Sequence, residues 1–238
     1  MYLQDMPDIV MANNQVSYIK LILWPAILTL AVTLARLAGE LLDGPHWLFG
    51  PQAGGGFSLV GIVWLVPVFG IYFARRLAAD GRGAKSRALP LQTALLGFFF
   101  VIVVALAGVR VSFTNPYLKT ALLLWAPILA AALIQFLAWP ALARALLVYA
   151  FAARVPVALL MFFAMLGNWG THYDAVPQGF PEASLAFRYL WLGLLPQFVF
   201  WVGLTVLVGS LFGSAAFALK KAKPSPDSDL PDYSDPAP

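Results

Sequence analysis

The chain has 238 residues, of which 61% are hydrophobic and 11% are charged, less than half of the roughly 25% charged residues of a typical soluble domain. There are 15 Lys and Arg against 11 Asp and Glu, a formal net charge of +4, and no cysteine. Without cysteine the chain has no disulfides, no thiolate metal ligands and no thiol nucleophile. This composition excludes an ordinary soluble domain and indicates a membrane protein.

Long apolar stretches separated by short polar breaks fill most of the chain. They cover residues 18–42, 57–73, 90–109, 117–139, 145–166 and 189–211. A helix needs about 20 apolar residues, within a range of about 17–25, to cross a bilayer core of about 30 Å. The sequence therefore predicts an all-α fold, a polytopic membrane bundle of six transmembrane helices that occupies residues 18–220 as one domain.

The orientation of this bundle follows from the basic residues between the second and third stretches. This connection contains Arg75, Arg76, Arg82, Lys85 and Arg87. Connections rich in Lys and Arg stay on the cytoplasmic side, so that six spans place both termini there as well. We expect residues 1–17 to be a short cytoplasmic segment, and residues 221–238, rich in Pro, Ser and Asp, to be a disordered cytoplasmic tail.

Basic residues that flank membrane spans set topology and contact lipid headgroups, and they do not indicate nucleic-acid binding. The expected partners are the lipid bilayer and other membrane protein subunits, without nucleic acid. The expected location is multi-pass in a bacterial cytoplasmic membrane. The sequence identifies no cofactor.

Polar residues gather where the first apolar stretch ends. Arg36, Glu40 and Asp43 are spaced by four and three residues, which places them on one face of a helix, and His46 follows. Glu40 is expected at membrane depth, where a lone carboxylate is costly. Arg36, one helical turn earlier, is its natural partner, so the sequence predicts an ion pair.

The chain's second histidine, His172, lies two residues before Asp174 in the long fifth connection, which the predicted topology places on the same outer face as His46. We expect this connection to fold back over the bundle. Imidazole and carboxylate groups are ligands of Zn²⁺ and Mn²⁺, and a metal-activated water there would hydrolyse a lipid ester or phosphodiester. The alternative is that the two histidines are separate anchors at the membrane interface.

Arg154 is the one charge near the middle of the fifth stretch. A guanidinium at that depth has to face the bundle interior or extend toward the cytoplasmic surface, and Gln197, Tyr149 and Glu40 are candidate partners. Ionisable residues inside a membrane are often functional, but a structural role in which Arg154 binds backbone carbonyls fits the sequence equally well.

Three classes of function fit these features. The sparse polar residues favour a non-catalytic accessory or lipid-interacting membrane protein. The first alternative is an outer-face metal-dependent lipid or phosphodiester hydrolase built on the polar cluster. The second is a small-solute transporter that is not coupled through an intramembrane carboxylate, because the second to sixth stretches contain no Asp or Glu.

Overall fold

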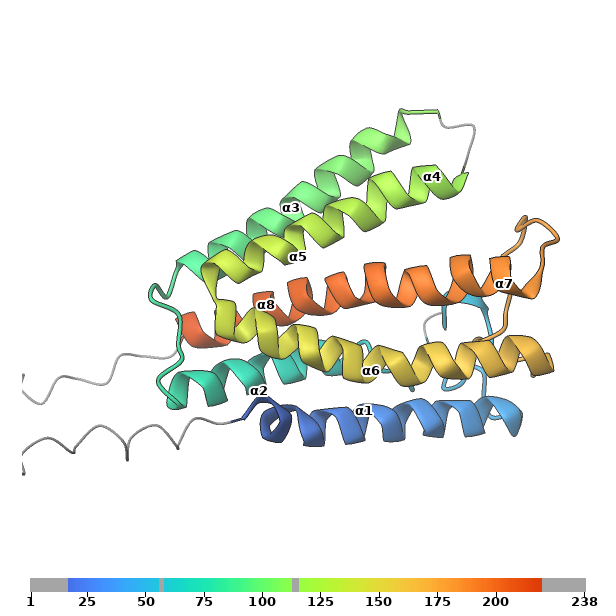
Figure 1. Cartoon of the computed structure of the whole chain (residues 1–238), viewed down its shortest axis with the longest axis horizontal. Coiled ribbons are helices and arrows are strands. Elements are labelled where there is room, and N and C mark those ends of the chain that lie inside the picture. Colours follow the sequence, from blue (N-terminus) through green and yellow to red (C-terminus); the bar gives the residue numbers. More distant parts are fainter. Residues whose placement is uncertain (1–16, 56–57, 113–115, 220–238) are drawn as a thin grey trace, which may run out of the picture.

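The structure is a computed structural model that describes residues 17–55, 58–112 and 116–219. The described residues form a bundle of helices and include no β-strand (Figure 1). The predicted all-α fold is confirmed. The predicted tail at 221–238 and nearly all of the predicted N-terminal segment at 1–17 lie outside the described residues.

Five helical rods within the described residues are long and apolar enough to cross a membrane. They are α1 (Tyr18–Leu41), α3 (Leu89–Val109), the rod Tyr117–Ala138, α6 (Pro140–Gly167) and the rod Leu185–Ala218. The third rod joins α4 (Pro116–Thr120), the π-helical segment η3 (Ala121–Trp125) and α5 (Ala126–Ala138). The last rod joins α7 (Leu185–Arg188), the π-helical segments η4 (Tyr189–Leu194) and η5 (Pro196–Trp201), and α8 (Val202–Ala218). The protein is thus a multi-pass, membrane-embedded helical bundle.

The predicted second span at 57–73 differs from the structure. Its helix, α2 (Leu65–Ala79), begins later and has 15 residues, or about 22 Å at 1.5 Å per residue, which is shorter than a bilayer core of about 30 Å. Residues 58–64 form bends and turns after the short 3₁₀ helix η2 (Ala53–Gly55). The backbone N–H groups of Leu59 and Val60 donate to the carbonyls of Trp47 and Leu48, both at 3.2 Å. These bonds satisfy the backbone without a helix, so that six full-length spans are not confirmed.

α2 and α8 pack very closely, because glycines face each other across their interface. A Cβ atom on Gly70 would lie 2.4 Å from the carbonyl oxygen of Gly209, and one on Gly213 would lie 2.6 Å from the carbonyl oxygen of Gly70. In a membrane, where lipid is as apolar as the side chains, such close approach is a main source of helix association. α3 lies at the edge of the bundle, and only 17% of its apolar window is buried, so that most of its surface faces lipid.

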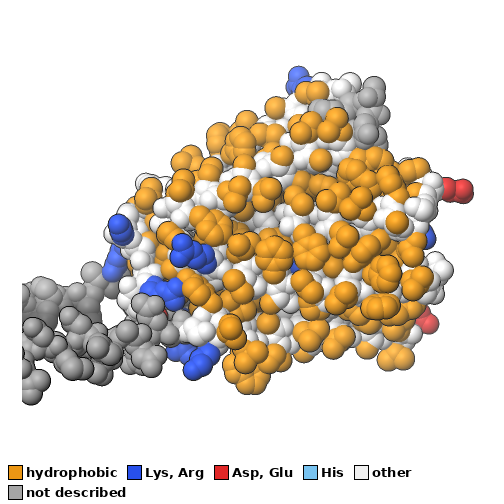
Figure 2. Space-filling view, in the orientation of Figure 1, with side chains coloured by type: hydrophobic (Ala, Val, Ile, Leu, Met, Phe, Trp, Pro, Cys, Tyr) orange, Lys and Arg blue, Asp and Glu red, His pale blue; other side chains and the backbone are white. Residues whose placement is uncertain are grey.

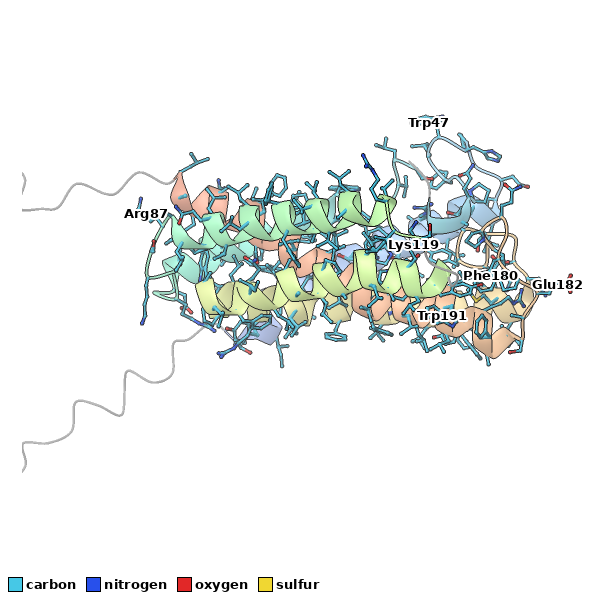
Figure 3. All side chains as sticks on the ribbon, turned by 90° about the horizontal axis from the view of Figure 1, so that it is seen from above. Trp47, Arg87, Lys119, Phe180, Glu182 and Trp191 are labelled. Atoms are coloured by element: carbon cyan, nitrogen blue, oxygen red, sulfur yellow. The ribbon has the colours of Figure 1, made fainter. Side chains whose placement is uncertain are left out.

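The two ends of the bundle differ in charge. The end where α2 leads into α3 carries Arg75, Arg76, Arg82, Lys85 and Arg87, and it is called the basic end below. Lys and Arg side chains gather at this end while hydrophobic side chains cover the flank of the helices (Figure 2). Figure 3 places Arg87 at the basic end and Trp47, Phe180 and Glu182 at the opposite end. α1 and α3 begin, and α8 ends, at the basic end (Figure 1).

Candidate functional site

One face of α1 carries polar side chains although the helix is otherwise apolar. Thr29, Thr33, Arg36 and Glu40 are spaced by three or four residues and are all buried, where α1 packs along α6. Toward the middle of the bundle, the Thr29 hydroxyl bonds the Tyr149 hydroxyl of α6 at 2.8 Å. This polar seam runs from the middle of the bundle to the end opposite the basic end.

The hydroxyls of Thr29 and Thr33 bond the backbone of α1. The hydroxyl of Thr29 donates to the carbonyl of Pro25 at 2.8 Å, and that of Thr33 donates to the carbonyl of Thr29 at 2.9 Å. A backbone carbonyl accepts hydrogen bonds. The hydroxyls therefore satisfy the backbone of α1 around Pro25 and hold α1 against α6.

Glu40 is the centre of the cluster at the end of this seam. Its side chain is fully buried, and its Oε1 accepts from the Nε of Arg36 at 2.7 Å, so that the predicted ion pair is present. The other oxygen, Oε2, accepts from the backbone N–H of His172 at 2.8 Å, and the Nδ1 of His172 donates to Oε1 at 2.6 Å. One carboxylate thus joins α1 to a loop 132 residues away in the chain.

Arg36 connects the cluster to a third segment. Its Nη2 donates to the carbonyl oxygen of Gly50 at 3.1 Å and to the hydroxyl of Ser58 at 3.3 Å. The Ser58 hydroxyl also accepts from the backbone N–H of Gly50 at 2.8 Å. The guanidinium therefore fixes the irregular segment that precedes α2.

The loop that carries His172 is held by its own turn. α6 ends at Gly167 and is capped by Asn168, which has a left-handed φ of 48°, and Gly170 has a φ of 73° that favours glycine. The Asp174 carboxylate accepts from the backbone N–H groups of Gly170 and Thr171 at 2.9 and 2.7 Å. The buried Tyr173 donates its hydroxyl to the carbonyl of Thr33 at 3.2 Å. This part of the predicted external connection does fold back onto the bundle.

The surroundings of His172 favour its neutral form. Burial lowers the pKa of its imidazole below the ordinary value of about 6.5, the hydrogen bond to Glu40 opposes this, and the charge of Arg36 lowers the pKa further. Because a carboxylate only accepts hydrogen bonds, Nδ1 carries the proton and Nε2 carries the lone pair. Among the described residues Nε2 has no hydrogen-bond partner.

The structure does not gather all of the predicted cluster. Arg36, Glu40 and His172 are in contact, and Asp174 bonds within its own loop. Asp43 and His46 are exposed. Within residues 17–55, 58–112 and 116–219 no three His, Asp or Glu side chains lie close enough to hold a metal ion, so that the predicted metal chemistry has no ligand set there.

Arg154 lies inside the bundle with only 5% of its surface exposed. Its Nη1 donates to the Oε1 of Gln197 at 3.4 Å, and its guanidinium carbon lies 4.7 Å from the ring centre of Trp201. Both partners belong to η5. Gln197 was one of the three predicted partners, whereas neither Tyr149 nor Glu40 hydrogen-bonds Arg154 in the described structure.

Two apolar grooves open on the flank of the bundle. The larger, about 660 Å³, lies between α2 and α8 near the basic end and is lined by Ile71, Ala74, Arg75, Ala78, Phe212, Ala215, Ala216, Phe217 and Leu219. The smaller, about 350 Å³, lies between α1 and α2 and is lined by Trp24, Pro25, Ile27, Leu28, Ala31, Phe69 and Tyr72. Arg75 is the one charged residue that lines either groove.

Sequence reasoning missed several of these residues. The hydroxyls of Thr29 and Thr33 were detectable, because their four-residue spacing continues through Arg36 and Glu40 on the same face. The bond between Tyr173 and Thr33 spans 140 residues and the bond between Arg36 and Ser58 spans 22, so that helical spacing predicts neither. No protein-family model, curated protein or solved structure matches the chain, so that its function has to be inferred from these residues themselves.

Proposed function

We propose that the protein is a lipid-interacting membrane protein of the bacterial cytoplasmic membrane that holds an anionic phospholipid in the groove between α2 and α8. This role needs no reaction. The observation that supports it is the combination of an apolar groove with a single charged lining residue, Arg75, at the basic end.

The lining of the groove suits an acyl chain with an anionic headgroup. The small side chains of Ala74, Ala78, Ala215 and Ala216 leave the space, and the charge of Arg75 lies near the basic end, where the headgroup would be. Each basic residue near a membrane surface attracts anionic lipid by about 1 kcal/mol. If the basic end is cytoplasmic, as the sequence predicts, the groove opens to the inner leaflet.

The test compares two neighbouring arginines. Arg75→Gln and Arg76→Gln remove the same charge from α2, but Arg76 does not line the groove and instead lies 5.9 Å from the ring centre of Tyr72. Binding of phosphatidylglycerol and phosphatidylcholine to purified protein is measured by native mass spectrometry. Arg75→Gln should weaken phosphatidylglycerol binding about five-fold, and Arg76→Gln much less.

Equal binding of the two lipids by the unchanged protein would contradict the proposal, as would equal losses in the two variants. Ala78→Leu provides a further check without a change of charge. The larger side chain fills the groove and should weaken the binding of phosphatidylglycerol and of phosphatidylcholine alike.

A second candidate is an outer-face ester hydrolase, which the hydrogen bond between His172 and Glu40 favours. A neutral imidazole held by a carboxylate can take a proton on Nε2 from an attacking water while the water oxygen bonds the ester carbon, and return it to the leaving alkoxide. Hydrolysis of short-chain phospholipid esters by the purified protein tests this candidate. His172→Gln should abolish the reaction and His46→Gln should preserve it; hydrolysis that survives His172→Gln would rule the candidate out.

A further inference from the structure

Arg154 is a buried charge without an acidic partner. Its side chain lies in α6, and no Asp or Glu within the described residues forms an ion pair with it. A charge at such a position is costly unless it is paired, and ionisable residues inside membrane bundles mark sites of function. The contact with the ring of Trp201 at 4.7 Å offsets only part of this cost.

Hydrogen-bond donors exceed acceptors around this charge. The Nε of Arg154 is buried and has no hydrogen-bond partner among the described residues. The amide nitrogen of Gln197 donates only to the sulfur of Met161, at 3.4 Å, and sulfur is a weak acceptor. The amide oxygen of Gln197 already accepts from Arg154. Two neighbouring side chains thus present poorly satisfied donors, one of them charged.

The partners of Arg154 lie on an unusual segment of helix. η5, which carries Gln197 and Trp201, is π-helical and follows closely after η4. π-Helical turns are rare, and they are frequently found at functional sites. The orphaned donor and the π-helical segment are independent observations that coincide at Arg154.

We propose that Arg154 and Gln197 form a binding site for the carboxylate of a long-chain fatty acid. A carboxylate supplies the two acceptor oxygens that the surplus donors lack, in the planar geometry that a guanidinium matches. The surrounding helices are apolar and suit the acyl chain, and Met161 is an unbranched side chain that can move to admit the headgroup. The site belongs to α6 and η5 and not to the groove between α2 and α8. An experiment can therefore contradict this proposal without contradicting lipid binding in the groove.

The experiment uses the full chain in detergent with a nitroxide-labelled stearic acid as the probe and its methyl ester as the uncharged control. Electron paramagnetic resonance measures the immobilised fraction of each probe. The acid should bind at least about ten-fold more tightly than the ester, because hydrogen bonds to charged groups are among the stronger ones. Arg154→Gln and Gln197→Leu should both reduce this preference.

Arg144→Gln is the matched control, since Arg144 is an exposed arginine on the same helix. It should leave the preference unchanged. If Arg154→Gln does not fold, Gln197→Leu still tests the site, because it removes an amide and leaves no new charge unpaired.

Equal affinity for acid and ester would overturn the proposal. So would a preference for the acid that survives both Arg154→Gln and Gln197→Leu. Recovery of the protein with a second membrane protein that Arg154→Gln releases, without any preference for the acid, would mean that Arg154 pairs with a carboxylate of a partner subunit instead.

Discussion

Glu40 joins α1 to the loop that carries His172, because its carboxylate accepts from Arg36 and from both the ring and the backbone of His172. Glu40→Gln should lower the free energy of unfolding by about 3 kcal/mol, the lower end of the cost of breaking a buried ion pair. Unfolding of the detergent-solubilised protein measures this loss. Asp43→Asn, at an exposed position on the same helix end, is the control and should change little.

The docked loop should be sensitive to pH through His172. The folded pKa of this histidine lies below its unfolded value of about 6.5, so that the unfolded chain binds more protons at lower pH. Its contribution to stability is therefore fully present above about pH 6.5 and is lost as the pH falls toward the folded pKa. Melting temperatures at a series of pH values check this expectation.

The chain contains only two histidines, which makes the control simple. His172→Gln should remove the pH dependence in this range, and the exposed His46→Gln should retain it. A pH dependence that follows His46 would contradict the assignment.

Sequence spacing predicted contacts within one helix but not contacts between distant segments. The contact of Arg36 with Glu40 lies within one helix, and the four-residue spacing was sufficient to predict it. The contact of Glu40 with His172 spans 132 residues, so that no spacing rule reaches it. Sequence placed His46 and His172 on one face, but it could not show that only His172 turns inward, because that depends on the turn that Asp174 closes.

The association of α2 with α8 rests on the absence of side chains at the contact. Gly70→Ala would place a Cβ atom 2.4 Å from the carbonyl oxygen of Gly209, which is backbone and cannot rotate away. The substitution should destabilise the protein by about 1–3 kcal/mol, the usual cost of overpacking. Val68→Leu, which adds bulk on the exposed face of α2, should be nearly neutral in the same unfolding measurement.

The boundaries of α2 show where apolar composition stops being informative. Residues 58–64 are as apolar as a membrane helix, and the predicted span at 57–73 was based on that composition. Whether this segment becomes helical depends on the loop that precedes it. Backbone bonds from Leu59 and Val60 to that loop replace helical hydrogen bonds, and the side chain of Arg36 additionally binds that of Ser58. The long spans were predictable because an apolar segment of that length has to satisfy its backbone hydrogen bonds within itself in a membrane, which a helix does.

For the whole molecule, we predict that the basic end of the bundle faces the cytoplasm. A reporter fused after Leu219 should behave as cytoplasmic, and one inserted at Gln178 should behave as external, because the basic residues between α2 and α3 lie at the end where α8 finishes. Alkaline phosphatase and green fluorescent protein fusions measure the two sides. The reverse pattern would place the groove with Arg75 in the outer leaflet.

The close packing of α2 on α8 also bears on how the protein is made. α2 leaves the ribosome long before α8, yet a helix of about 22 Å has little to hold it across the lipid until that late partner arrives. α2 is therefore only weakly held in the membrane until α8 has been synthesised. A chain cut short before α8 should expose α2 to membrane quality-control proteases, and supplying α8 as a separate peptide should rescue it.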